Sequence, residues 1–386
     1  MKDFEPNEFV KLAKDIYGEN EILLHRPVFS HREADYLTEC IASNFVSSVG
    51  MRVVEFENLI ASYVGSKRAV ACVSGTAALH VSLKALGVGP GSQVITQALT
   101  FVATSNAISY CGAEHIFIDV DIDSLGMSPV ALKSWLSENA IIEAGKAKNK
   151  YTGKTISCCL PMHTFGMPCR IQEIADICLS YGIPLLEDTA ESLGSWVGNL
   201  HTGTFGTAAT FSFNGNKTIT TGGGGMVVTN NIELAEKLKY LTTTSKRPHA
   251  YEYFHDEVGY NYRLPNINAA LGVAQMEILD QILEIKRGLA ETYKHFFFNK
   301  GIKFVEPIDG AKSNNWLNTI IFDNRSERDN FLQITNENGV MTRPIWKLMT
   351  DLPMYSMCDN DGLRNSKWLV DRVVNIPSSV PSIGET

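Results

Sequence analysis

Lys217 has the sequence surroundings of a reactive amine. It lies in the segment TFSFNGNKTITTGGGGMVVTN (210–230), between two apolar runs and without an acidic residue in the segment. A lysine that is taken out of water loses its proton readily and can act as an amine nucleophile and base. A solvated lysine in a hairpin is the ordinary alternative. That alternative does not explain the four glycines at 222–225 as well as a ligand site does, because glycines let the backbone pass close to a ligand.

Acidic residues gather at the end of a second apolar run. The segment LLEDTAES (185–192) places Glu187, Asp188 and Glu191 where a buried strand would end. A carboxylate in such a place is costly unless it meets a cation. The carboxylate would either form a structural ion pair or cap a helix, or it would pair with the protonated ring nitrogen of a ligand.

A third segment, SGTAALH, begins at Ser74 between a strand-like run and an apolar-periodic helix. Free N–H groups at a helix start favour a phosphate, and glycine lets the backbone approach it closely. A serine that caps the helix without any ligand is the ordinary alternative. Two other glycine segments do not match nucleotide-binding motifs: GNKT has Asn216 where a P-loop needs glycine, and GVGPG (87–91) is not GxGxxG.

Together the three segments match the needs of pyridoxal 5′-phosphate. This cofactor takes a lysine amine for a Schiff base, a carboxylate beside its pyridinium nitrogen and a phosphate cup. Lys217, Asp188 and the segment from Ser74 supply these three groups. A lysine released by substrate can then move a proton between the substrate and the cofactor.

The elements that must hold these residues alternate between strands and helices. Apolar runs near 93–96, 114–120, 156–162 and 183–189 predict strands, and helical patterns begin at Thr76 and Arg170. Short apolar strands between amphipathic helices indicate an α/β fold with a large, mainly parallel sheet. In such a sheet, reactive residues lie at the carboxyl ends of the strands and in the loops that follow.

The pattern changes in the last third of the chain. A long helical stretch is expected from about Asn266 to Phe298, followed by a strand at 318–323 and a helix from Ser326. We therefore expect a large cofactor-binding domain at 1–258 and a smaller C-terminal α/β domain at 259–386. The length of 386 residues suits two domains.

Composition excludes several classes of protein. Thirty-four Lys and Arg against 42 Asp and Glu give a net charge of −8, which argues against a broad surface for nucleic acid. No apolar stretch approaches the ~20 residues of a membrane span, and MKDFEPNEF lacks the apolar core of a signal peptide. The eight cysteines form no CxxC pair, so we expect no metal, reduced thiols and a cytoplasmic protein.

Several long motifs in one order resemble the DegT/DnrJ/StrS family of nucleotide-sugar aminotransferases. The resemblance runs from about Phe45 to Tyr355, and it implies the aspartate aminotransferase-like fold type I of pyridoxal phosphate enzymes. It rests on SGTAALHVSLKALGVGPGSQVITQALTFVATSNAI, PMHTFGMP, LLEDTAESLGS, FSFNGNKTITTGGGGMVVT and GYNYRLPNINAALGVAQ.

The resemblance implies a role for individual residues. It makes Lys217 the Schiff-base lysine and Asp188 the partner of the pyridine nitrogen. The implied phosphate ligands are Gly75, Thr76 and Ser212, with Asn261 donated by the other subunit of a homodimer.

The resemblance also places Phe101 on the cofactor ring, although a core phenylalanine would look the same in sequence. His163 matches a family motif, which implies a place at the substrate site, and it is equally well explained as a structural histidine. Two residues depart from the family pattern: Glu191 replaces Gln or His near the ring oxygen of the cofactor, and Gly223 replaces Glu.

A narrower resemblance concerns the substrate. FVSSVG (45–50) and MTRPIWKLMTDLPMY (341–355) are similar to legionaminic-acid-type enzymes, which aminate C4 of a nucleotide-linked 2-acetamido-4-keto-2,4,6-trideoxyhexose with L-glutamate as donor. It implies substrate contacts for Arg343, Trp346 and Ser48, for which a surface salt bridge, core packing and loop packing are the respective alternatives. A loop at 242–256 reaches the neighbouring site or is simply solvated. A perosamine-type sugar and a non-catalytic cofactor-binding regulator remain as other functions.

Overall fold

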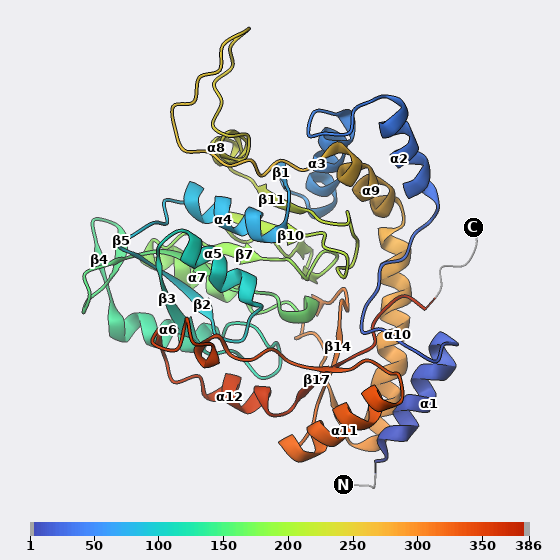
Figure 1. The fold of residues 1–386 in the computed structure, drawn as a ribbon. Coiled ribbons are helices and arrows are strands. Elements are labelled where there is room, and N and C mark those ends of the chain that lie inside the picture. Colours follow the sequence, from blue (N-terminus) through green and yellow to red (C-terminus); the bar gives the residue numbers. More distant parts are fainter. Residues whose placement is uncertain (1–3, 382–386) are drawn as a thin grey trace.

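The computed structural model describes residues 4–381 and has the expected α/β architecture (Figure 1). The helices are α1 (Pro6–Tyr17), α2 (Arg32–Ala42), α3 (Met51–Val64), α4 (Gly75–Ala85), α5 (Val102–Tyr110), α6 (Pro129–Asn139), α7 (Ile171–Tyr181), α8 (Ile232–Thr242), α9 (Asn266–Glu277), α10 (Leu279–Lys300), α11 (Arg325–Glu337) and α12 (Arg364–Val370).

The strands are β1 (Arg68–Cys72), β2 (Ser92–Gln97), β3 (Glu114–Ile118), β4 (Ala140–Glu143), β5 (Lys146–Asn149), β6 (Thr155–Leu160), β7 (Leu186–Asp188), β8 (Trp196–Val197), β9 (Leu200–His201), β10 (Ala208–Ser212), β11 (Gly225–Thr229), β12 (Lys303–Phe304), β13 (Ala311–Lys312), β14 (Asn318–Ile321), β15 (Arg343–Pro344), β16 (Asp359–Asn360) and β17 (Val373–Ile376).

The large sheet consists of two parts that meet between β6 and β7. One part has the order β1-β11-β10-β7 and the other β16-β3-β2-β6-β5-β4. Isolated parallel bridges, Cys159 with Leu185 and Met162 with Asp188, join them. The pairs β10–β7, β2–β6 and β2–β3 are parallel, whereas β11 runs antiparallel to both of its neighbours. The carboxyl ends of β1, β2, β7 and β10 therefore meet at one edge.

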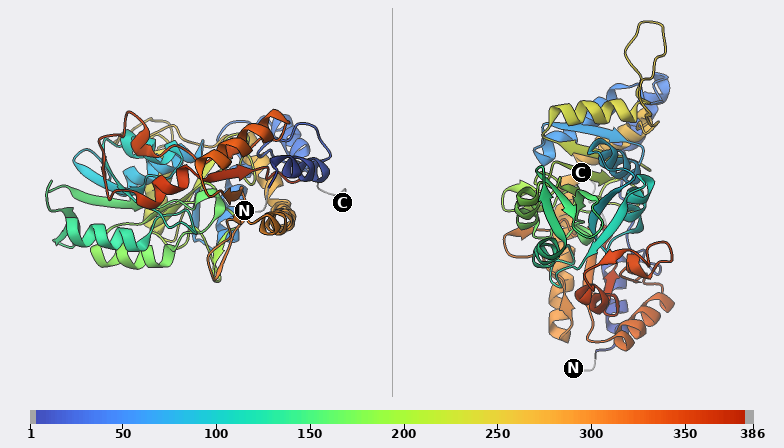
Figure 2. Two further views of the ribbon diagram at one scale, coloured as in Figure 1. Left: turned by 90° about the horizontal axis from the view of Figure 1, so that it is seen from below. Right: turned by 90° about the vertical axis from the view of Figure 1, so that its left-hand side faces the viewer.

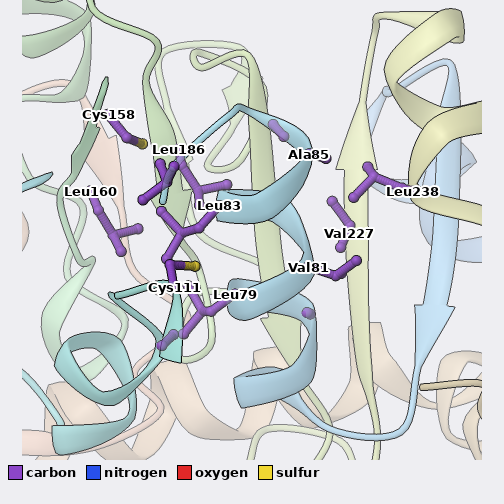
Figure 3. Packing of buried hydrophobic residues seen from close by; sticks show 14 of the residues in the cluster. Leu79, Val81, Leu83, Ala85, Cys111, Cys158, Leu160, Leu186, Val227 and Leu238 are labelled. Carbon is purple, nitrogen blue, oxygen red and sulfur yellow. The ribbon is translucent and has the colours of Figure 1, made fainter. Parts of the chain in front are cut away.

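Helices cover both faces of this sheet, because its strands alternate their side chains between two apolar clusters. Ala208 and Val227 belong to the cluster around α4, whereas Ala209 and Phe211 belong to the cluster with α3, α9 and α10. Helix α4 itself is buried on two sides. In Figure 3, Leu79 and Leu83 point toward Leu160 and Leu186, and Val81 points toward Val227 and Leu238. This packing fixes the start of α4 at the sheet edge.

The C-terminal part has its own core around the sheet β12-β14-β17-β15. Helix α1 packs into the same core, where Phe9 contacts Tyr293, Phe297 and Phe331. The division that we propose at residue 258 therefore leaves α1 packed on the C-terminal body. The long helix expected from 266 to 298 is two helices, since Ile278 has the non-helical angles φ −111° and ψ 2° between α9 and α10.

The loop between α8 and α9 extends away from the body as an exposed arm (Figures 1 and 2). An antiparallel bridge joins Lys246 to His255, and Thr243 pairs with Asn261 at its base. Tyr251, Tyr253 and other apolar side chains of the arm are exposed. None of the helices within residues 4–381 is both long and apolar enough to cross a bilayer. All eight cysteines are free thiols, and seven are buried.

Candidate active site

A cavity of about 360 Å³ lies at the carboxyl edge of the sheet. Loops after β1, β2, β7 and β10 line it, and the loop after β10 carries Lys217. Eight of the residues predicted from the sequence lie in its wall: Gly75, Thr76, Phe101, Asp188, Glu191, Ser212, Lys217 and Trp346. The topology of the parallel sheet brings the loops at its carboxyl edge together, and Trp316 and Trp346 of the C-terminal part complete the wall.

The start of α4 forms one end of the cavity. Ser74 caps the helix by accepting a hydrogen bond from the Ala77 amide at 3.1 Å, and Gly75 and Thr76 follow as the first helical residues. A Cβ atom on Gly75 would lie 2.8 Å from Cβ of Ser212, so only glycine lets β10 approach the helix start this closely. Ser74 therefore caps the helix, which was the ordinary alternative for this segment. The same helix start also faces the cavity. Free amides and the helix dipole favour an anion there.

Asp188 lies at the end of β7 and is 2% exposed. Its Oδ2 accepts a hydrogen bond from the Thr104 hydroxyl at 2.7 Å, and its Oδ1 accepts one from the Ala190 amide at 3.1 Å. Burial nevertheless raises the pKa of Asp188 above its usual range. A cation placed in the cavity beside this carboxylate would favour its ionised form.

Lys217 and Glu191 form a buried ion pair in the cavity wall. The Lys217 Nζ donates to Oε1 of Glu191 at 3.0 Å, and the Phe165 amide donates to Oε2 at 2.9 Å. Burial raises the pKa of Glu191 to about 7 despite the nearby Lys217. Lys217 is therefore a site residue and not a solvated hairpin lysine, with only 13% of its side chain exposed.

Aromatic rings cover the mouth of the cavity. Phe101 is 47% exposed and is the residue before α5, so it does not belong to the core. Its ring lies 6.0 Å from the ring of Trp346, and Trp346 packs against Phe165 at 4.8 Å. A planar ligand at this mouth would meet an aromatic face.

Arg343 lies outside this cavity, in the wall of a second one of about 550 Å³. The two cavities adjoin, since Asn216, Trp316 and Trp346 line both. The Arg343 guanidinium donates to Asn336 and to the Thr342 carbonyl, and within residues 4–381 it has no carboxylate partner. The surface salt bridge considered from the sequence is thus not present in the described part.

Two predicted residues do not line the cavity of their own chain. Asn261 is exposed at the base of the arm, where its Oδ1 accepts two hydrogen bonds from Arg263. Ser48 lies in the loop between α2 and α3, next to Ser47, whose carbonyl accepts the Asn266 amide. Neither residue lines either cavity in this chain.

His163 is completely buried behind the cavity and does not line it. Its Nδ1 accepts the Cys169 amide, so Nε2 carries the proton and donates to Glu187 at 3.1 Å. Glu187 also accepts the amides of Gly203, Phe205 and Gly206. These contacts suit the structural role that was the alternative for His163, and the substrate contact stays a prediction.

Sequence reasoning missed Trp316, Asn314 and Thr104. The Trp316 ring centroid lies 4.0 Å from Nζ of Lys217, and Asn314 donates to the carbonyls of Glu191 and Leu193. The segment SNNW (313–316) places polar and aromatic residues just before an apolar strand, and this was the available signal. The contact across about 100 residues was not visible in a local pattern.

The residues present fit pyridoxal phosphate. The cavity combines an amine, a buried carboxylate that a cation beside it would stabilise, and an exposed aromatic ring. It also contains a helix start at which Gly75 lets β10 approach closely. A metal is not implied by this donor set, and residues 4–381 contain no group of three His, Cys, Asp or Glu side chains that could hold one.

Comparison with known proteins identifies the family of this chain. The model of the DegT/DnrJ/EryC1/StrS aminotransferase family matches residues 28–385. EpsN of Bacillus subtilis is 39% identical over 87% of this chain and 84% of its own, and the GDP-perosamine synthase of Vibrio cholerae is 35% identical over 92% and 94%. A family aminotransferase from Brucella abortus has the same fold, with a TM-score of 0.81, 27% identity and 92% of each chain covered. The expected fold type I is therefore confirmed, and this chain is a pyridoxal phosphate-dependent sugar aminotransferase that belongs to the DegT/DnrJ/EryC1/StrS family.

Proposed function

We propose that this chain transfers the amino group of L-glutamate to C4 of a nucleotide-linked 4-keto sugar. The observation that carries the proposal is the convergence of Lys217, Asp188 and the start of α4 on one cavity. The aromatic mouth and the adjoining second cavity leave room for a substrate beside the cofactor.

Each end of the cavity would hold a different part of the cofactor. The amides of Gly75 and Thr76 and the Ser212 hydroxyl would bind its phosphate at the positive end of the helix dipole. Asp188 would pair with the ring nitrogen, held in place by Thr104 and the Ala190 amide. When bound, the cofactor supplies an electron sink for the bond changes at the amino-bearing carbon.

Lys217 would act as the amine that carries the cofactor and then as the base that moves the proton at the reacting carbon. Glu191 holds the free amine at 3.0 Å, which keeps it pointed into the cavity. Phe101 would cover the ring and exclude water from it.

Arg343 and Trp346 would contact the nucleotide sugar from the C-terminal body. Arg343 has guanidinium N–H groups on the second cavity, and Lys347 adds a second cation to the same wall. Cations of this kind bind the phosphates of a nucleotide. The negative overall charge is therefore compatible with an anionic substrate, because the contacts are local.

We also propose a homodimer in which Asn261 and Ser48 serve the partner's site. Neither residue lines the cavity of its own chain, and Asn261 is at the base of an arm with exposed Tyr251, Tyr253 and Val258. Apolar side chains exposed at this level mark an interaction surface.

Two sugars are candidates for the substrate. The sequence motifs at 45–50 and 341–355 favour the 2-acetamido-4-keto-2,4,6-trideoxyhexose expected above, in legionaminic acid or bacillosamine-type glycan synthesis. The relatives favour a perosamine-type sugar, since GDP-perosamine synthases of Vibrio cholerae and Escherichia coli O157:H7 are each 35% identical to this chain. We place the perosamine-type sugar first, because whole-chain identity weighs more than two short motifs.

The cofactor assignment is tested by absorbance. The purified chain loaded with pyridoxal phosphate should absorb in the visible, and Lys217→Ala should lose that band while remaining folded. Lys11→Ala, which removes an exposed lysine of α1, is the control and should keep it. An unchanged visible band in Lys217→Ala would refute the role of Lys217.

The substrate is tested with UDP-, GDP- and dTDP-linked 4-keto sugars, each with L-glutamate as donor and mass spectrometry of the products. Amination of the GDP-linked sugar alone supports the perosamine-type candidate, and amination of the UDP-linked 2-acetamido sugar alone supports the other. Failure of all three, with an intact visible band, would contradict amination of 4-keto sugars.

A further inference from the structure

The indole ring of Trp316 contacts the Lys217 loop at two points. The Lys217 Nζ lies 4.0 Å from the ring centroid, and the indole N–H donates to the Asn216 carbonyl at 2.7 Å. Trp316 is 4% exposed, so this cation–π contact is largely removed from water. A desolvated contact of this kind is stronger than one on the surface.

The backbone of Trp316 is fixed to the same site through Asn314. The Trp316 amide donates to Oδ1 of Asn314 at 2.9 Å. The Asn314 Nδ2 donates to the Glu191 carbonyl at 2.8 Å and to the Thr218 hydroxyl at 3.1 Å. Trp316 therefore keeps a constant position relative to both partners of the Lys217–Glu191 ion pair.

A second lysine, Lys286, donates a hydrogen bond to the backbone of Trp316. It comes from α10, is completely buried and has no carboxylate partner within residues 4–381. Its ammonium donates to the Trp316 carbonyl at 3.3 Å, to Nε2 of His25 at 3.1 Å and to the Ser378 carbonyl. Three acceptors match the three N–H bonds of an ammonium group, although burial lowers the pKa of Lys286 to about 7.

We propose that Trp316 is a positioning residue that holds the free amine of Lys217 beside Glu191, and that Lys286 supports Trp316 in this place. The inference rests on the proposed role of Lys217, whose amine is free whenever it is not bonded to the cofactor. A ring attracts the cation without fixing the directions of its N–H bonds. Lys217 can therefore turn from Glu191 toward the reacting carbon without leaving the ring.

The test uses the full chain without cofactor. Reductive methylation with formaldehyde and cyanoborohydride, followed by peptide mass spectrometry, gives the labelling rate of Lys217 relative to exposed Lys11. Loss of the ring in Trp316→Leu should raise this ratio about 5- to 30-fold, the range that a cation–π contact of roughly 1–2 kcal/mol gives at 25 °C. Lys286→Met should raise it in the same direction.

Matched variants separate positioning from general damage. Trp368→Leu removes a surface ring that faces Arg372 at 4.6 Å, and Lys294→Met removes an exposed lysine of α10. Both should leave the labelling ratio of Lys217 unchanged. If Trp316→Leu does not fold, Trp316→Phe, which keeps a smaller ring, should still raise the ratio at least about 2-fold.

The loaded enzyme gives a second readout. Trp316→Leu or Trp316→Phe should lower kcat at least about 5-fold and leave KM for both substrates within about 2-fold. An unchanged labelling ratio in the folded Trp316 variants would overturn the proposal, even if Lys217→Ala abolishes the visible band. If no keto sugar is aminated, the proposed function fails, whereas the labelling ratio still decides the role of Trp316.

Discussion

The Nζ atom of Lys217 lies 3.0 Å from Oε1 of Glu191, and the Glu191 side chain is 1% exposed. Little water reaches this ion pair, so each charge depends mainly on the other for its stabilisation. Removing one partner leaves the other as an uncompensated charge, and this cost is larger than for a surface pair. The behaviour of the site with pH follows from the carboxylate of this pair.

Glu191→Gln should alter the pH dependence of stability in the cofactor-free chain. The pKa of Glu191 is about 7 in the fold and 4.5 for an ordinary glutamate, so the native state binds the extra proton between these values. The stability that this proton contributes is complete below pH 4.5 and is lost as pH rises through 7. Relative to Glu191→Gln, the wild type should lose about 1.4 kcal/mol per pH unit in this window.

Urea unfolding of both proteins from pH 4.5 to 8 measures this difference. Glu236→Gln, which removes an exposed carboxylate of α8, controls for the change in net charge. A constant difference between wild type and Glu191→Gln over the whole range would contradict the pKa of Glu191.

Gly75→Ala should weaken both the fold and the binding of the cofactor. The new Cβ would lie 2.8 Å from Cβ of Ser212, so α4 and β10 must move apart. We expect a loss of about 1–3 kcal/mol in unfolding free energy and a higher dissociation constant for pyridoxal phosphate. Gly89→Ala meets nothing within 4 Å and is the control. Equal cofactor affinity in wild type and Gly75→Ala would count against a phosphate site at this helix start.

Thr104→Val should weaken cofactor binding without changing the shape of the site. It removes the 2.7 Å hydrogen bond to Oδ2 of Asp188, and this raises the pKa of that buried carboxyl further. A hydrogen bond to a charged group contributes roughly 1.5–3 kcal/mol, so affinity should fall at least about 10-fold. Absorbance titration of the cofactor-free chain measures it. Thr210→Val, whose buried hydroxyl has no partner, should have no such effect.

His163→Leu should destabilise the fold and leave the chemistry of the folded fraction intact. Glu187 would keep three amide donors and lose its only side-chain donor. A loss of roughly 1.5–3 kcal/mol is expected when a buried hydrogen bond to a charged group is removed. Unfolding experiments and the KM for the keto sugar measure the two effects. A large rise in KM with unchanged stability would place His163 at the substrate site.

The sequence predicted the parts of the site that depend on strand ends. Asp188 and Ser212 are the last residues of β7 and β10, and Gly75 lies three residues after the end of β1. The topology of a parallel sheet brings residues at such positions together. The sequence did not predict Trp316, which reaches Lys217 from a different body of the fold. Contacts of that kind depend on how two bodies pack and leave no periodic pattern in the chain.

The sequence was also unable to separate cap from ligand site at Ser74, or substrate contact from core support at His163. In both cases, the decisive fact is the direction of a side chain relative to a cavity. The break at Ile278 was equally invisible, because the residues of α9 and α10 form one uninterrupted helical pattern.

Helix α10 is one continuous helix whose residues belong both to the core beside the large sheet and to the C-terminal core. Its first turns pack beside Phe213, its middle carries Lys286, and its last turns hold Tyr293 and Phe297 in the C-terminal core. A helix of 22 residues is roughly 33 Å long, so a tilt of about 5° at Ile278 displaces its far end by roughly 3 Å. A small rotation at the break would thus change the distance between Arg343, on the C-terminal side of the second cavity, and Asn216 on its other side.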